Sequence, residues 1–386
     1  MKWIQQLATA AVFTVTLGPV AALADDEELE LRAQFESIIQ GLNDNSFDRF
    51  NRAIVNKDMT ARIYASRLIE PDVKKAFTNE FSASFEQMFV SSFPKSKNEI
   101  LGTLIDFRFN GNEGHAVVRY AASGYRYSYH DYELRLDSKG RIVIVDWIDY
   151  YQGNRFSDEA GEALVMAMPS KPATRNLLEN KNLGDAQIFQ VAELFKAVRD
   201  KKPERFFQIY DGMDAALHKE KIVAKLNLQL ALLARDAGRI ESAARTLVES
   251  YPDDSMSSLK LVEYYIPARQ YEEAIDALVR LQQGIGFEDG ATESLKASAA
   301  LAMGNTDDAE KYALQATVVE PSLELCWWSL LRARTRAGDY AGATEALARL
   351  EEDFGHTLDA QKLQRDRFLK VLTDKPEYLD WRATRE

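Results

Sequence analysis

A repeat of about 34 residues in the C-terminal half constrains this chain more than any other feature. Four alanines mark equivalent positions, separated by 31, 35 and 34 residues, and each follows a short helix-turn signal. A fixed period near 34 residues is typical of stacked helix pairs, in which each unit buries its apolar face against its neighbours. Such stacks usually hold partners and rarely perform chemistry. The four anchoring positions are Ala243, Ala274, Ala309 and Ala343.

The spacing of small residues and turns within each unit follows from helix packing. Alanine at a crossing point lets two helices approach to roughly 8–10 Å. Glycine before the second helix permits the positive φ that a tight turn needs. The clearest unit begins its turn at Gly304 and stops at Pro321, and the next carries Trp327 on its first helix. The turn signals are Gly238-Arg239-Ile240, Arg269-Gln270-Tyr271, Gly304-Asn305-Thr306 and Gly338-Asp339-Tyr340.

These units resemble tetratricopeptide repeats. The resemblance implies an all-α solenoid over residues 173–386, with a degenerate repeat at about 185–218 and a C-terminal capping helix. In that family the first helix of each unit lines a concave face that binds a protein or peptide. Only Lys225 and Asn227 match the carboxylate clamp of its chaperone-tail members. Carried over to this chain, the partner groove consists of Leu228, Leu232, Arg235, Glu263, Trp328, Arg332 and Arg336.

Trp328 has two interpretations at this stage. Trp and Arg dominate interface hot spots, so Trp328 with Arg332 and Arg336 could anchor a partner. Alternatively, Trp328 packs against the capping helix. The sequence leaves both open.

The N-terminus predicts export. Lys2 precedes an apolar stretch, residues 7–23, which ends in Ala22-Leu23-Ala24 before a run of acidic residues. This order is typical of a secretory signal peptide over residues 1–24, cleaved after Ala24. A membrane anchor is the alternative, but the stretch is short for a bilayer core of about 30 Å. We therefore expect a chain secreted across the inner membrane into a bacterial periplasm, and not an integral membrane protein.

Charge and composition exclude several classes of function. Cleavage removes Lys2 from 48 basic residues, which leaves 47 against 60 acidic ones, a net charge near −13. This balance argues against nucleic acid as a partner. Cys326 is the only cysteine and the four histidines lie far apart, so we expect no metal and no cofactor. Cys326, next to two tryptophans, is expected to be a buried thiol.

Residues 25–172 have a different hydrophobic pattern, which predicts an α+β domain followed by a short helix and a linker. Apolar residues recur at helical spacing up to Pro94, and the period then changes to two. Four strands are expected at 100–109, 115–121, 125–136 and 141–151, joined by hairpin turns at residues 111–114, 123–124 and 138–140. Helices before an antiparallel meander predict helices packed on one face of a curved sheet.

This order resembles the cystatin-like cone of the nuclear-transport-factor-two-like superfamily, on Tyr132 to Leu136, Gly140, Asp146-Trp147 and the exit at Tyr151 to Gly153. The resemblance implies a pocket between helices and sheet, which different members use for catalysis, lipid carriage or dimerisation. A His130–Asp146 pair in the cone could serve as a general base. The alternative is that His130 makes a structural hydrogen bond. The candidate pocket residues are Phe81, Phe85, His130, Tyr132, Asp146 and Tyr150.

Three functions are therefore open. The leading one is an exported, non-enzymatic scaffold or adaptor that binds a protein or peptide through the concave face of the array. The second is an apolar-ligand or lipid-binding protein that uses the N-terminal cavity, with the array as docking platform. The third, an enzyme using His130 and Asp146, is the weakest, because no nucleophile elbow or phosphate loop is present.

Overall fold

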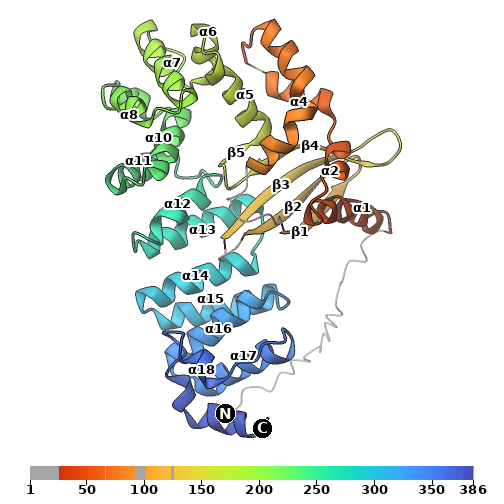
Figure 1. The fold of residues 1–386 in the computed structure, drawn as a ribbon, viewed down its shortest axis with the longest axis vertical. Coiled ribbons are helices and arrows are strands. Elements are labelled where there is room, and N and C mark those ends of the chain that lie inside the picture. Colours follow the sequence, from red (N-terminus) through yellow and green to blue (C-terminus); the bar gives the residue numbers. More distant parts are fainter. Residues whose placement is uncertain (1–25, 66, 92–100, 123–125, 386) are drawn as a thin grey trace, which may run out of the picture.

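A five-stranded antiparallel sheet lies between two groups of helices (Figure 1). The computed structural model describes residues 26–65, 67–91, 101–122 and 126–385, so the predicted signal peptide lies outside the described residues. Within the described segments, helices α1–α4 precede the sheet and α5–α19 follow it. The predicted α+β domain followed by an all-α helical region is confirmed.

The sheet is a simple meander with the order β1-β2-β3-β4-β5. The β1–β2 and β3–β4 hairpins turn at Gly111 and Gly140, where φ is +62° and +71°, a conformation that favours glycine. Both turns were predicted, whereas the predicted break at residues 123–124 lies outside the described residues. The strands are β1 (Leu101–Asn110), β2 (Glu113–Ala122), β3 (Arg126–Leu136), β4 (Ile142–Asp149) and β5 (Asn154–Arg155).

The N-terminal helices cover one face of the sheet. Phe35 and Phe50 pack their rings against Tyr132 at centroid distances of 5.6 and 6.0 Å, and Phe50 also meets Trp147 at 6.1 Å. All four side chains are fully buried. Each large aromatic side chain removed from water contributes roughly 1.5–3 kcal/mol. The helices are α1 (Asp26–Asn43), α2 (Asp48–Ala53), α3 (Asn56–Tyr64) and α4 (Pro71–Ser91).

Two short helices lead from the sheet to the array, α5 (Phe156–Ala167) and α6 (Lys171–Leu177). Ser170 caps α6 by accepting a hydrogen bond from the backbone N–H of Ala173. The domain boundary predicted at residue 172 thus falls inside α6, which packs against α7 together with α5.

The C-terminal half is a stack of antiparallel helix pairs that forms a long column (Figure 1). Each helix from α10 to α16 packs on the next one, and α8 packs on α7 and α10. The helices are α7 (Asp185–Arg199), α8 (Pro203–Asp211), α9 (Ala215–His218), α10 (Lys221–Ala234), α11 (Ala237–Ser250), α12 (Ser258–Tyr265), α13 (Tyr271–Ile285), α14 (Gly290–Met303), α15 (Thr306–Val319), α16 (Glu324–Ala337), α17 (Tyr340–Glu352), α18 (Ala360–Leu363) and α19 (Pro376–Ala383), with a 3₁₀ turn at Leu372–Asp374.

One residue with a left-handed backbone conformation lies between the two helices of each pair, and these residues mark equivalent positions of the repeat. These residues follow one another at steps of 34, 34, 35 and 34, so the pair α7–α8 belongs to the series as predicted. The anchor predicted at Ala243 is corrected: Gly238 lies inside α11, and the position five residues after the left-handed residue, which is alanine in the last three pairs, is Ile240. The left-handed residues are Lys201, Arg235, Arg269, Gly304 and Gly338.

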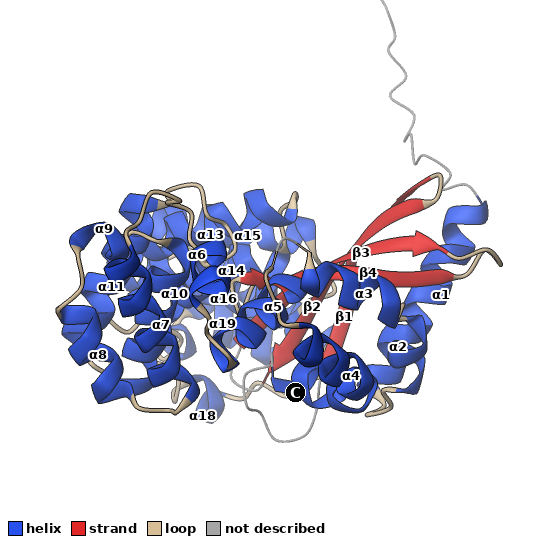
Figure 2. Ribbon diagram, turned by 90° about the horizontal axis from the view of Figure 1, so that it is seen from above, coloured by secondary structure: helices blue, strands red, loops and turns tan. Residues whose placement is uncertain are grey.

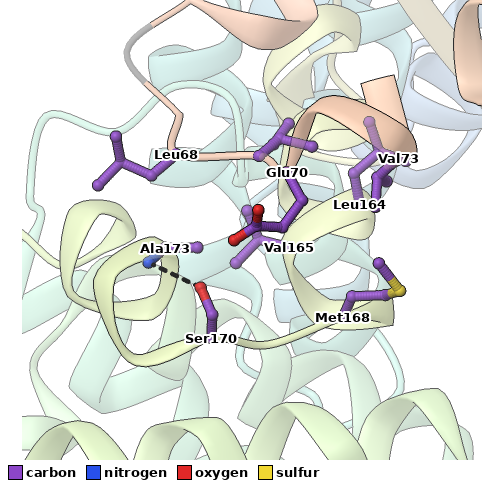
Figure 3. Close-up of a pocket in the computed structure, with 9 residues that line it drawn as sticks. Leu68, Glu70, Val73, Leu164, Val165, Met168, Ser170 and Ala173 are labelled. Atoms are coloured by element: carbon purple, nitrogen blue, oxygen red, sulfur yellow. Dashed lines mark hydrogen bonds between the residues drawn. The ribbon is translucent and has the colours of Figure 1, made fainter. Parts of the chain in front are cut away.

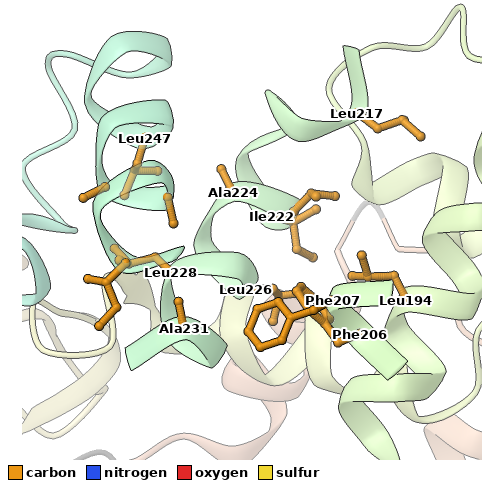
Figure 4. Packing of buried hydrophobic residues seen from close by; sticks show 14 of the residues in the cluster. Leu194, Phe206, Phe207, Leu217, Ile222, Ala224, Leu226, Leu228, Ala231 and Leu247 are labelled. Carbon is orange, nitrogen blue, oxygen red and sulfur yellow. The ribbon is translucent and has the colours of Figure 1, made fainter. Parts of the chain in front are cut away.

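The interior of the array is continuous from one pair to the next (Figure 4). Phe206 and Leu194 of the first pair lie close to Ile222 and Leu226 of α10 in one buried cluster. Alanines at the crossing points, Ala231 among them, are completely buried. Because each pair depends on its neighbours for burial, the array is expected to unfold with cooperativity along its length.

Candidate functional site

The sheet docks on one edge of the array, and this junction is the best-defined polar site of the described structure. The face of the sheet opposite helices α1–α4 contacts the array. It meets the N-terminal end of the first helix of a pair and the C-terminal end of the second helix. Val117, Tyr129 and Tyr150 of the sheet share a buried cluster with Leu259 of α12 and Leu281 of α13. Figure 2 shows the array and helices α1–α4 on opposite sides of the sheet.

A buried ionic network holds the centre of this junction. Arg119 of β2 donates through Nη1 to Asp289 Oδ1 at 2.6 Å and to Glu320 Oε2 at 2.7 Å, and through Nη2 to Glu320 Oε1 at 2.7 Å. Asp289 Oδ2 accepts from the Tyr129 hydroxyl at 2.6 Å. It also accepts from the backbone N–H of Ala291 and so caps α14. One carboxylate therefore serves a helix end and the contact between two domains.

The electrostatic environment of the network keeps Arg119 charged and Tyr129 neutral. Burial by itself lowers the pKa of Arg119, but the hydrogen bonds that Arg119 donates to Glu320 and the charge of Asp289 outweigh it and raise that pKa overall. Burial also raises the pKa of Tyr129 well above its usual value. The guanidinium stays charged and the phenol stays neutral, which is the protonation pattern that the network requires.

Two lysines of the array bind the chain segment that follows β4. Lys225 of α10 donates to the carbonyl of Gly153 and, at 2.7 Å, to Asn154 Oδ1. Lys260 of α12 donates to the carbonyl of Gln152 at 2.6 Å. Burial lowers the pKa of both amines, that of Lys225 to about 8. The ends of these first helices thus bind a polypeptide segment through its main-chain carbonyls.

Two glutamates of α5 face the same lysines. Burial is the main cause that raises the pKa of Glu159 to about 7, with the charge of Asp149 adding to it and the charge of Lys260 opposing it. Burial likewise raises the pKa of Glu162 to about 6 against the charge of Lys225. The junction therefore contains two carboxylates whose pKa values are raised toward neutral pH and two amines whose pKa values are lowered.

The carboxylate opposite His130 is Asp149, and the predicted His130–Asp146 pair is wrong. A bulge between Glu133 and Leu134 in the β3–β4 pairing sets Asp146 opposite Glu133 and Asp149 opposite His130. His130 Nε2 lies 3.4 Å from Asp149 Oδ2. Its Nδ1 lies 3.0 Å from the Tyr132 hydroxyl. The side chains of His130, Asp149 and Tyr132 are buried.

Asp146 caps a helix instead. Its carboxylate accepts from Ser157 Oγ at 2.6 Å and from the Ser157 N–H at 3.2 Å at the start of α5. Burial raises its pKa. This is the normal role of an aspartate at a helix N-terminus, so Asp146 is not the carboxylate partner of His130.

The other predicted pocket residues do not gather in one place. Phe81 is buried beside Phe77 at a ring distance of 5.4 Å, in the core that contains Tyr132. Tyr150 lies on the opposite face of the sheet, with Leu281. Phe85 belongs to α4, but its side chain lies outside the described residues.

A small apolar pocket lies where α4 begins and α5 ends (Figure 3). Leu68 and Val73 line it from one side and Leu164 and Met168 from the other, and its volume is about 10 Å³. Such a volume holds about one water molecule. This pocket is therefore too small for a lipid or another apolar ligand.

The predicted partner groove is only partly open. Leu228 is buried in the array core and Leu232 is half-buried against it, so both are packing residues. Arg235, Glu263 and Arg336 are exposed. Of the two clamp-like residues, Lys225 binds the chain's own loop and Asn227 is buried.

Trp328 packs within the C-terminal end of the array. Arg332 lies over its ring at 5.5 Å and pairs through Nε with Asp366 at 2.9 Å, while His356 meets the ring edge at 5.6 Å. The indole N–H donates to Glu324 at 2.7 Å. These contacts favour the capping interpretation over an open anchor. Cys326 is buried, as expected.

The junction residues Arg119, Asp289, Glu320 and Lys260 were not predicted as a site. Arg119 offered one signal, a single charge inside the apolar run of β2 between Val118 and Tyr120. A charge at such a position is rarely buried without a partner.

Comparison with known proteins adds no assignment. No protein-family model matches this chain, and a search of curated proteins finds no match. Among the described residues, no cluster of three or more His, Cys, Asp and Glu could hold a metal ion. No helix of the described segments is long and apolar enough to cross a membrane.

Proposed function

We propose that this chain is an exported, non-enzymatic scaffold that binds a protein or peptide partner through a helical array of the tetratricopeptide type. The observation that supports the proposal is that the sheet occupies one edge of the array, while Arg235, Glu263 and Arg336 of the predicted groove stay exposed. The sheet occupies only the ends of the helices, through Arg119 and its partners. Helical solenoids use such extended surfaces to hold partners.

Three exposed charged residues of the predicted groove support binding on that side of the array. Arg235 directly follows α10, Glu263 lies in α12 and Arg336 lies in α16. The lysines at the helix ends give a second argument, because Lys225 and Lys260 bind main-chain carbonyls of residues 152–153. The array thus already binds one polypeptide segment, its own.

The test is capture by the mature chain, residues 25–386, from an extract of the exported compartment, with proteins and lipids both read by mass spectrometry. The wild type should retain a specific protein that an R235E/E263K/R336E variant loses. A matched variant with the same charge change, R32E/E80K/R205E, alters three residues that are exposed outside the predicted groove and should retain that protein.

A lipid or apolar molecule recovered in equal molar amount, with no protein partner, would support the alternative function. In that alternative the ligand lies in the N-terminal domain and the array is a docking platform. Equal capture by all three chains would show that the partner binds elsewhere.

A further inference from the structure

Helix α12 is the shortest first helix among its neighbours, and a groove lies beside its C-terminal end. It has 8 residues, whereas α10, α14 and α16 have 14 each. Pro267 follows it and lacks the N–H that another helical turn would use. A groove of about 310 Å³ lies between α11 and the start of α13, at the end of α12 away from the sheet.

The floor of this groove is aromatic and apolar. Tyr264 and Tyr265 come from the last turn of α12, with ring centroids 5.4 Å apart. Ala244 and Val248 of α11 complete the floor. Tyrosine faces attract cations as well as apolar groups.

The rim of the groove is acidic. Glu241, Glu249 and Glu273 line it together with one cation, Arg245. Glu241 pairs with Arg245 at 2.8 Å. In the described part of the chain, Glu249 and Glu273 form no ion pair, so two negative charges remain uncompensated at the rim. Farther along α13, the negative charge of Asp276 raises the pKa of Tyr265 and the positive charge of Arg280 lowers it.

A buried acceptor points to the kind of group that belongs there. Gln270 is one of the lining residues, and its Oε1 is buried behind the groove surface with no hydrogen-bond donor among the described residues. A buried carbonyl oxygen without a donor is unfavourable, and natural structures contain few of them. The groove therefore offers acceptors and aromatic faces, and Arg245 is the one donor cation among its lining residues.

We propose that this groove binds a basic segment of a partner protein, with a lysine or arginine side chain seated on the two tyrosines. The ammonium or guanidinium group donates to Glu249 or Glu273 and, after the Gln270 side chain turns into the groove, to Gln270 Oε1, and its aliphatic stem covers Ala244 and Val248. The proposal deepens the scaffold function and rests on it. It commits to a basic polypeptide because the negative charges of Glu249 and Glu273 have no ion-pair partner among the described residues and Gln270 Oε1 has no donor there.

The test is selection from a random 12-residue peptide library displayed on phage against the whole mature chain. Selected peptides should be enriched in Lys and Arg. Their affinity, measured by fluorescence anisotropy, should fall at least about tenfold for E249K/E273K, which reverses two rim charges. It should fall about fivefold or more for Q270L, which removes the buried acceptor without changing the charge.

The matched control is E377K/D380K. Like Glu273 and Glu249, these are exposed acids in the first and last turns of a helix, here α19. The control should bind selected peptides within about twofold of the wild type. Basic peptides that bind the wild type, the groove variants and the control equally would overturn the proposal, since they would report only the overall acidity of the chain.

Selection of non-basic peptides, or of none, would also overturn it. Non-basic peptides that need Arg235, Glu263 and Arg336 would leave the scaffold function standing while the groove inference fails. Failure of the scaffold function itself is read separately, from the absence of a captured protein in the extract experiment.

Discussion

Arg119 of β2 and Glu320 at the end of α15 form a two-point ion pair, although 201 residues separate them. Both distances are 2.7 Å, and Arg119 is almost completely buried. A pair of this kind ties the sheet to the fourth helix pair of the array. The N-terminal domain and the array therefore form one unit in which either part positions the other.

Removing Arg119 should separate that unit. In R119M, the carboxylates of Asp289 and Glu320 would face each other without a cation. Breaking a buried pair from one side costs about 3–5 kcal/mol. We expect urea unfolding of R119M to show a loss of about 3 kcal/mol, whereas R32M, which breaks the exposed pair Arg32–Glu36, changes the free energy of unfolding by less than about 0.5 kcal/mol. Equal stability of R119M and the wild type would contradict a structural role for the network.

Glu159 should make stability depend on pH between about 5 and 8. Its folded pKa, about 7, lies above the ordinary value of 4.5. As pH rises through this window, the unfolded chain ionises first, so the wild type loses stability that E159Q keeps. Because Glu159 is half-buried and partly screened, we expect E159Q to gain about 1–2 kcal/mol relative to the wild type from pH 5 to pH 8.

The measurement is urea unfolding of both chains at the two pH values, with E80Q as an exposed control. A difference between E159Q and the wild type that stays constant with pH would show that Glu159 titrates normally.

At the left-handed positions between paired helices, two matched substitutions should change the stability of the protein in opposite directions. Gly338 has φ +85°, and G338A should lose about 1 kcal/mol because a Cβ disfavours this conformation. Arg269 adopts the same region at φ +60°, so R269G should be neutral or gain up to about 1 kcal/mol. Thermal unfolding of the two variants measures both. The same sign for both would contradict the common register of the pairs.

Trp328 should act in stability and not in partner binding. W328A removes the ring between Arg332 and His356, and a loss of about 2 kcal/mol is expected for a half-buried aromatic. Amide hydrogen exchange over residues 357–371 should become faster, whereas R336A, at an exposed position, leaves it unchanged. Unchanged exchange in W328A with loss of a captured partner would restore the anchor interpretation.

Much of the fold was predictable, because its signals are local. Gly304 and Gly338 mark two turns of the array, and the alternating strands and glycine turns mark the meander. The first anchor was misplaced, since Arg235 and Arg269 adopt the left-handed conformation without being glycine. Propensity gives no reason to expect arginine there, and only the packed structure reveals it.

The junction was not predictable, because its partners are distant and individually ordinary. In the sequence, Asp289 is typical of a helix cap and Glu320 is a residue before a proline. Neither position predicts an ion pair with Arg119. The His130 pairing failed for another reason: one bulge shifts the β3–β4 register, and a shift of that kind redirects the side chains beyond it. Sequence alternation cannot locate such a bulge.

Native mass spectrometry of residues 25–386, purified from the producing cells under mild conditions, tests the proposed scaffold function most directly. The account predicts a complex whose added mass is that of a protein or peptide, lost in R235E/E263K/R336E. A chain that carries instead one small apolar molecule, in the wild type and the variant alike, would contradict it.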